Sequence, residues 1–169
     1  EVAPVYEEYV SKVAGPELRD RVIKHLKDGV RHWYGLSDEE RFDNHVQRPA
    51  FWVHPAKNTH DLATAMLPNL MRARMDEIGI DFSIVYPTFG LLVPRIPEED
   101  VRRAACRALN LMHAELMGDH ADRMIPAAAI PMFTPEEGVE EIAYACDELG
   151  YRVVMLQGNV RRPMLGQDG

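Results

Sequence analysis

Histidine is the first residue type in this sequence that could do chemistry, because it binds metals and transfers protons. Seven histidines occur, and no two of them are separated by a single residue. His25 and His32 lie seven residues apart, as do His113 and His120, and this spacing is two turns of a helix. Metal-binding histidines on one helix usually lie four residues apart, so we interpret these as surface histidines. The sequence assigns no metal ligand and no catalytic residue.

A loop with two prolines, RPAFWVHPAKN over residues 48–58, is the first candidate for substrate contact. It has no clear hydrophobic period and therefore reads as irregular structure. Trp52, His54 and Asn58 give it the aromatic and polar side chains that a loop over a substrate site needs. The alternative, which we favour, is a packed loop with Trp52 as its anchor.

Residues at the ends of apolar runs form the second group of candidates. Position alone nominates four of them: Tyr86, Thr88, Met132 and Gln157. Arg161 and Arg162 follow the last apolar run and could bind a carboxylate or a phosphate. A solvated pair is the more ordinary interpretation of two adjacent arginines.

The elements that must position these residues follow from the hydrophobic pattern. Three short apolar runs, at 81–88, 124–132 and 151–158, are expected to be buried strands. Helices are expected between them, and the second begins with a clear signal. Thr134 suits an N-cap, Pro135 suits the first helical position, and Glu137 completes a capping box. The apolar positions of that helix predict an inward face, listed here: Val139, Ile142, Ala143, Cys146 and Leu149.

The remaining helices are expected before the first strand and directly after it. Glu98, Glu99 and Asp100 are interpreted as charge at a helix start and not as paired catalytic acids. Gly79 and Gly150 suit the left-handed position that ends many helices. The expected helices of the first half cover 4–13, 16–28, 37–46 and 59–78, the last interrupted at Pro68.

Strands that alternate with crossover helices indicate α/β architecture with a parallel sheet. The alternatives are a doubly wound sheet and part of a (β/α)8 barrel, and in both the carboxyl ends of the strands carry function. We expect a helical or irregular region over 1–58, acting as a lid or insertion, and a barrel segment of about three strands over 59–169.

Two stretches carry a resemblance to a known family: FWVHPAKNTHDLATAMLPNLMRARMDEIGIDFSIVYPTFGL and DRMIPAAAIPMFTPEEGVEEIAYACDELGYRVVMLQGNVRRP. They resemble the amidohydrolase-related family of metal-dependent hydrolases and decarboxylases, which includes aminocarboxymuconate semialdehyde decarboxylase. The resemblance implies a (β/α)8 barrel, a divalent metal with zinc as the expected ion, and a small carboxylated substrate. The family's histidine and aspartate ligands cannot be placed here. We therefore expect an internal fragment of such an enzyme that holds no metal on its own. The alternative is a non-catalytic binding or dimerisation module.

Composition limits the classes of partner. The chain has 19 basic and 27 acidic residues, and its net charge of -8 argues against nucleic acid. Its apolar runs are far shorter than a membrane span, so we expect no membrane partner, whereas a homo-oligomer stays open. Cys106 and Cys146 are expected to be buried free thiols, which fits a cytoplasmic location.

Overall fold

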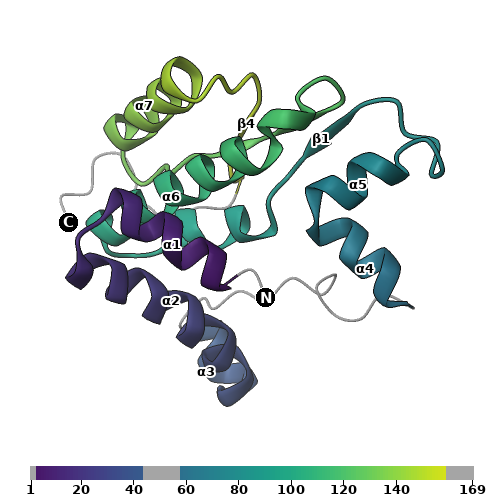
Figure 1. Ribbon diagram of the computed structural model, residues 1–169. Coiled ribbons are helices and arrows are strands. Elements are labelled where there is room, and N and C mark those ends of the chain that lie inside the picture. The colour runs from purple at the N-terminus through teal and green to yellow at the C-terminus, as the bar shows by residue number, and fades with distance from the viewer. Residues whose placement is uncertain (1–2, 44–57, 159–169) are drawn as a thin grey trace.

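The computed structural model describes residues 3–43 and 58–158 (Figure 1). Three of the predicted substrate contacts, Trp52, His54 and Arg161, lie outside the described residues, as does Arg162. All other candidates named from the sequence as substrate contacts lie inside them.

Helices make up the described part of the chain before residue 75. The helices expected at 4–13 and 16–28 are confirmed, and the second continues to Gly35. The helix expected at 37–46 is found up to Asp43, and residues 44–46 lie outside the described residues. The fourth is split at Leu67 because Pro68 begins a new helix. These elements are α1 (Ala3–Val13), α2 (Pro16–Gly35), α3 (Asp38–Asp43), α4 (Thr59–Met66) and α5 (Pro68–Arg74).

Short strands and longer helices alternate after residue 82. Gly79 and Gly150 both have a positive φ, of 73° and 72°, as expected for glycines that end helical segments. The strands are β1 (Ser83–Val85), β2 (Met124–Pro126), β3 (Ala128–Ala129) and β4 (Val154–Met155). The helices are η2 (Thr88–Leu91), η3 (Val93–Arg95), α6 (Glu99–Met117), η4 (Gly118–His120), α7 (Pro135–Ala143) and the π-helical η5 (Tyr144–Glu148).

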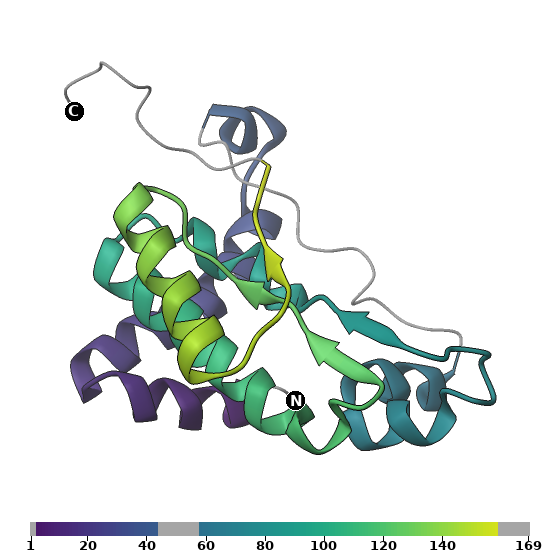
Figure 2. The same cartoon turned by 90° about the horizontal axis from the view of Figure 1, so that it is seen from above.

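All strand pairing in the described residues is parallel, as predicted. Ser83 pairs with Met124 in β1 and β2, and Ala128 pairs with Val154 in β3 and β4. Only Ala127 separates β2 from β3, and its N–H donates to the Val85 carbonyl over 3.0 Å. The segment 124–129 therefore lies between β1 on one side and β4 on the other, in chain order (Figure 2).

The expectation of a partial (β/α)8 barrel was wrong. The described residues are mostly helical and contain two small sheets of two strands each. Pairing covers three residues of β1 and two of β4, so the expected strands at 81–88 and 151–158 are much shorter than their apolar runs. Pro87 ends the first strand because proline lacks the N–H that the next ladder bond requires.

Helix α6 is the centre of the core, and α1 and α2 pack against it. Tyr6 of α1 is fully buried and donates its hydroxyl to the Ala105 carbonyl over 2.7 Å. Its ring stacks on Phe89, with 6.1 Å between centroids. Val101, Leu109 and Met112 are buried on the side of α6 that faces the core, whereas Leu116 near its end is 39% exposed. The N-terminal helices therefore share one hydrophobic core with the strands and α6.

The predicted inward face of the helix formed by α7 and η5 was wrong at three of its five residues, whereas Ile142 and Leu149 are partly buried and pack against the cluster that contains Ile130. Val139 is 66% exposed and Ala143 and Cys146 are also exposed, whereas Glu137 and Glu141 are buried. The physical reason lies on α6, which presents arginines to α7 and so draws its glutamates inward. Cys106 is buried as expected, and both cysteines are free thiols.

The buried side-chain amide of Asn110 takes the place of β1 beside Ala129 of β3. The Asn110 amide N–H donates to the Ala129 carbonyl over 3.0 Å, and its oxygen accepts from the Ala129 N–H over 2.8 Å. Backbone groups of successive strand residues point to opposite neighbours, so those of Ala129 face the side that β1 occupied up to Val85. Asn110 therefore satisfies two groups that would otherwise be buried without partners.

Candidate functional site

The carboxyl ends of β1 and β4 meet at Gly90. The Gln157 amide donates to the Gly90 carbonyl over 2.7 Å, across 67 residues of sequence. A Cβ on Gly90 would collide with the terminal methyl of Met155 and lie 3.0 Å from Cγ of Pro87. Glycine therefore allows this close approach without a shift of Met155, and the hydrogen bond ties the connection after β1 to the end of β4.

The candidates at the strand ends do not all come together. Thr88 begins η2, two residues before Gly90, and Gln157 contacts that same segment. Tyr86 lies at the end of β1 with 58% of its surface exposed. Met132 lies elsewhere, because it packs against the cluster that contains Ile130. The structure thus places Thr88 in the segment that Gln157 contacts and leaves Met132 in a separate hydrophobic contact.

Asn58 caps a helix. Its side-chain oxygen accepts from the Asp61 backbone N–H over 2.8 Å, and its amide donates to the Asp61 carboxylate over 2.7 Å. These two bonds are those of an N-cap residue. The polar atoms of Asn58 are therefore occupied at the start of α4.

Arg95 was missed by the sequence analysis. It ends η3 in the connection between β1 and α6, and its side chain is partly buried. Its side chain forms no ion pair or hydrogen bond with the described residues, and burial lowers the pKa of its guanidinium. Nothing in the sequence could have singled it out, because Glu98, Glu99 and Asp100 follow it and look like its natural partners.

Three ion pairs join α6 to α7 and differ strongly in burial. Arg102 and Glu137 form a bidentate pair, at 2.8 and 3.0 Å, with both side chains almost fully buried. Arg103 pairs with Glu140 at the surface, and Arg107 with the buried Glu141. Burial raises the pKa of the Glu141 carboxyl, while Asn110 and Arg107 oppose that effect.

The buried pair also joins backbone groups that follow β1 to those that begin α7. Arg102 donates to the carbonyls of Ile96 and Pro97. Its guanidinium carbon lies 3.9 Å from the centre of the Phe133 ring. Glu137 accepts from the Thr134 backbone N–H over 2.8 Å, within the predicted capping box, which is confirmed. All these groups are engaged with one another, so the network is structural.

The described histidines do not form a site. His25 lies 3.0 Å from the Glu98 carboxylate, and His120 bonds to Asn69 over 2.6 Å. The interpretation of His113 as a surface residue was wrong, because its Nδ1 is buried without a partner. Burial lowers the pKa of His113 to about 4, so this imidazole is neutral at pH 7.

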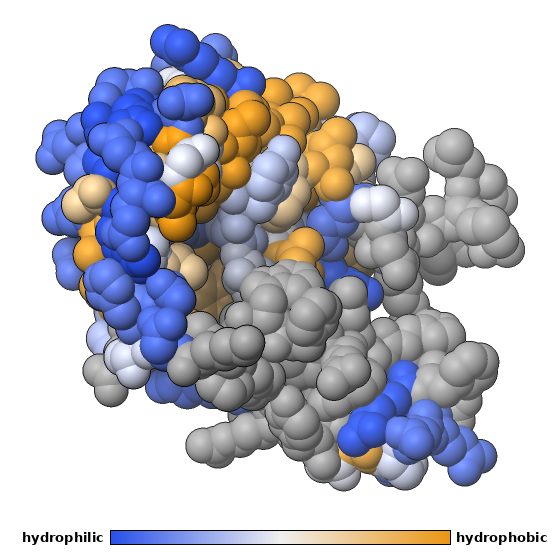
Figure 3. Space-filling model, turned by 90° about the vertical axis from the view of Figure 1, so that its right-hand side faces the viewer, coloured by the Kyte–Doolittle hydropathy of each residue, from blue (hydrophilic) through white to orange (hydrophobic). Residues whose placement is uncertain are grey.

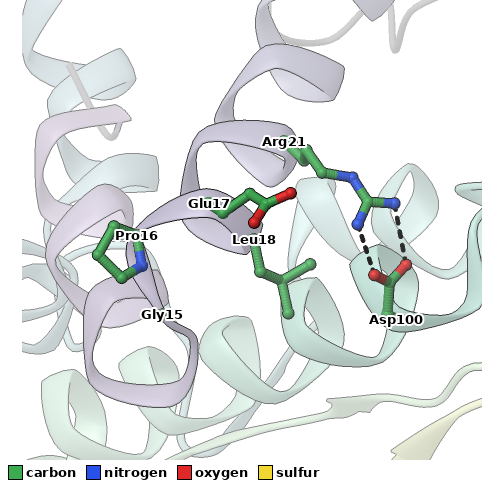
Figure 4. Close-up of a pocket in the computed structure, with 6 residues that line it drawn as sticks. All are labelled: Gly15, Pro16, Glu17, Leu18, Arg21 and Asp100. Carbon is green, nitrogen blue, oxygen red and sulfur yellow. Dashed lines mark hydrogen bonds and ion pairs between the residues drawn. The ribbon is translucent and has the colours of Figure 1, made fainter.

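A hollow of about 360 Å³ lies where α2 begins, against the start of α6 (Figure 4). It is lined by the following residues: Gly15, Pro16, Glu17, Leu18, Arg21 and Asp100. Arg21 and Asp100 face each other across it in a bidentate pair. The charged groups thus satisfy each other, and no strand residue lines the hollow among the residues that the structure describes.

The described residues do not fit a metal ion. Within 3–43 and 58–158, no group of three or more His, Cys, Asp or Glu side chains lies close enough to hold one. A catalytic zinc needs about three protein ligands and an open position. No reaction step is therefore derived through a metal held by these residues.

The fold and the comparisons with known proteins classify the chain only broadly. The described part defines a mostly helical α/β protein with short parallel strands, and none of its helices is both long and apolar enough to cross a membrane. The chain matches no protein-family model, no curated protein and no solved structure.

Proposed function

We propose that the chain is part of a metal-dependent hydrolase or carboxy-lyase that acts on a small carboxylated substrate. In this proposal the chain contributes part of the substrate wall, and the metal ligands come from residues outside 3–43 and 58–158. The resemblance of residues 51–163 to the amidohydrolase-related family supports the reaction class, and the expected compartment is the cytoplasm.

One structural observation carries the proposal. The ends of β1 and β4 are held together by the 2.7 Å bond between Gln157 and Gly90. Ligands of α/β proteins bind beyond the carboxyl ends of parallel strands. Tyr86 and Thr88 follow β1 at this same end, so the chain segment that Gln157 contacts at Gly90 also carries an aromatic ring and a hydroxyl.

The first test is the coding sequence on both sides of residues 1–169. The proposal expects a His-x-His pair before Glu1 and a histidine and an aspartate at later strand ends. The protein expressed from the complete coding sequence should then hold about one divalent metal per chain. It should also release carbon dioxide from, or hydrolyse, small aromatic or unsaturated carboxylates. Absence of the ligand residues from the complete sequence would contradict the proposal.

A second candidate function is a non-catalytic binding or dimerisation module. One observation favours it: Phe82, Ile84 and Tyr86 lie on one side of β1 and are 50%, 43% and 58% exposed. Figure 3 views the right-hand side of Figure 1 and shows hydrophobic surface in the upper part of this face, bordered by hydrophilic side chains. Metal-free protein from the complete coding sequence, without activity, would favour this alternative.

A further inference from the structure

One partly buried arginine has no anionic partner among the described residues. Arg95 lies in the connection between β1 and α6, and its side chain forms neither an ion pair nor a hydrogen bond with the described residues. Every other arginine whose side chain the structure describes, apart from the exposed Arg152, pairs with an Asp or a Glu. Among the arginine side chains that the structure describes, Arg95 is therefore the one that is partly buried and lacks an acidic partner.

Acidic residues close in sequence do not contact the Arg95 guanidinium, because each of them contacts another side chain. Asp100 pairs with Arg21, and Glu98 lies 3.0 Å from His25. Glu99 lies 3.5 Å from Arg103. Three carboxylates within five residues of Arg95 are thus engaged elsewhere, and the guanidinium stays available.

The backbone that carries Arg95 is held firmly on both sides. Val93 is fully buried before it and Ile96 is 7% exposed after it. The carbonyls of Ile96 and Pro97 accept hydrogen bonds from the buried Arg102. A cation on such a fixed segment loses little backbone freedom when it binds a ligand.

We propose that the Arg95 guanidinium binds the carboxylate of a small molecule at the connection between β1 and α6. The ligand class rests on the proposed function, which requires a small carboxylated substrate. A planar guanidinium matches a carboxylate with two parallel N–H···O bonds. Burial lowers the pKa of Arg95, as expected for a cation that has lost water without gaining an anion, yet an arginine stays charged at neutral pH.

The test uses the 169-residue chain and two probes of the same shape, benzoate and the uncharged benzamide. Binding is followed by backbone amide shifts of residues 88–98 in two-dimensional NMR titrations. Benzoate should shift these signals in a saturable way, and benzamide should bind more weakly by about tenfold or more. Arg95→Gln should weaken benzoate binding by a similar factor, and Arg95→Lys should lie between the two.

Arg152→Gln is the matched control, since Arg152 is exposed, pairs with no described carboxylate and precedes β4 at its amino end. It should leave the benzoate affinity within about twofold of the unchanged chain. Spectra of both variants without ligand should superimpose on that of the unchanged chain outside the substituted positions, which would exclude a loss of fold.

Equal binding of benzoate and benzamide, no saturable benzoate binding, or no effect of Arg95→Gln on the benzoate affinity would overturn the inference. Each of these results leaves the proposed function standing, because that function is judged by the metal ligands in the complete coding sequence. Conversely, absence of those ligands together with binding that depends on Arg95 would contradict the enzyme and retain the carboxylate site.

Discussion

At the scale of single residues, buried ionisable groups govern how stability responds to substitution and pH. Three of them lie on α6: Arg102, Cys106 and His113. Arg102 has a complete set of partners, Cys106 is an inert thiol whose pKa burial raises well above its ordinary value, and His113 is neutral with an unsatisfied nitrogen. These differences lead to two predictions.

Replacing Arg102 should be far more damaging than replacing its neighbour Arg103. Arg102→Leu leaves the Glu137 carboxylate buried and unpaired, so the free energy of unfolding should fall by about 3 to 5 kcal/mol. Arg103→Leu is the matched control, because its partner Glu140 is exposed, and should cost about 1 kcal/mol or less. Urea unfolding of both variants measures the difference. Equal losses would mean that the Arg102–Glu137 pair is not buried in solution.

His113 should make the protein less stable as the pH falls from 7 to 5. Its folded pKa is about 4 against an ordinary value of 6.5, so the unfolded state binds more protons within this range. The unfolding free energy should therefore drop by about 2 kcal/mol between pH 7 and pH 5 because of this residue. The carboxylates with lowered pKa values, such as Asp61 and Asp100, lose their contributions at lower pH.

The measurement compares urea unfolding at pH 7 and pH 5 for the unchanged chain, His113→Leu and the control His120→Gln. Only His113→Leu should remove most of the drop, because it removes the titrating group. A drop that persists in His113→Leu would assign the pH dependence to another residue.

At the scale of elements, capping decides where α7 begins. The Thr134 hydroxyl accepts from the Glu137 backbone N–H, and the Glu137 carboxylate accepts from that of Thr134. Thr134→Ala should lower the free energy of unfolding by about 1 kcal/mol, because one helical N–H loses its partner. Thr134→Ser keeps the hydroxyl and should lower the free energy of unfolding by only about a few tenths of a kcal/mol. Denaturant midpoints distinguish the two, and equal effects would show that the hydroxyl contributes nothing.

At the scale of the whole molecule, the exposed side of β1 should drive self-association. Within the described residues β1 pairs on one edge only, with β2, and unpaired strand edges beside exposed hydrophobic side chains attract other chains. Sedimentation velocity over a range of concentrations should show oligomers of the 169-residue chain. Ile84→Lys should reduce them, because it places a charge on the exposed side of β1.

Val139→Lys is the control, since Val139 is also exposed but lies on α7. It should leave the distribution of oligomers unchanged. A monomeric unchanged chain, or the same effect from both substitutions, would contradict association through β1.

Local signals in the sequence determined most of the helices and their ends. The capping box at Thr134, the break at Pro68 and the left-handed glycines depend on neighbouring backbone groups alone, so they could be predicted without knowledge of the fold. The parallel direction of the strand pairs followed in the same way, because the chain must return through a crossover helix before it can pair again.

Only the tertiary structure decided which faces are buried and how far the strands extend. Hydrophobic spacing predicted that Val139 of α7 is buried, but Glu137 and Glu141 are buried. These glutamates pair with arginines that are 34 or 35 residues away along the chain. The partial barrel failed for a similar reason, since strand length depends on neighbours that pair along both edges. The lack of an acidic partner for Arg95 becomes visible only in the structure, where Asp100, Glu98 and Glu99 contact other side chains. Each of these outcomes depends on contacts between distant segments, which spacing along the chain does not specify.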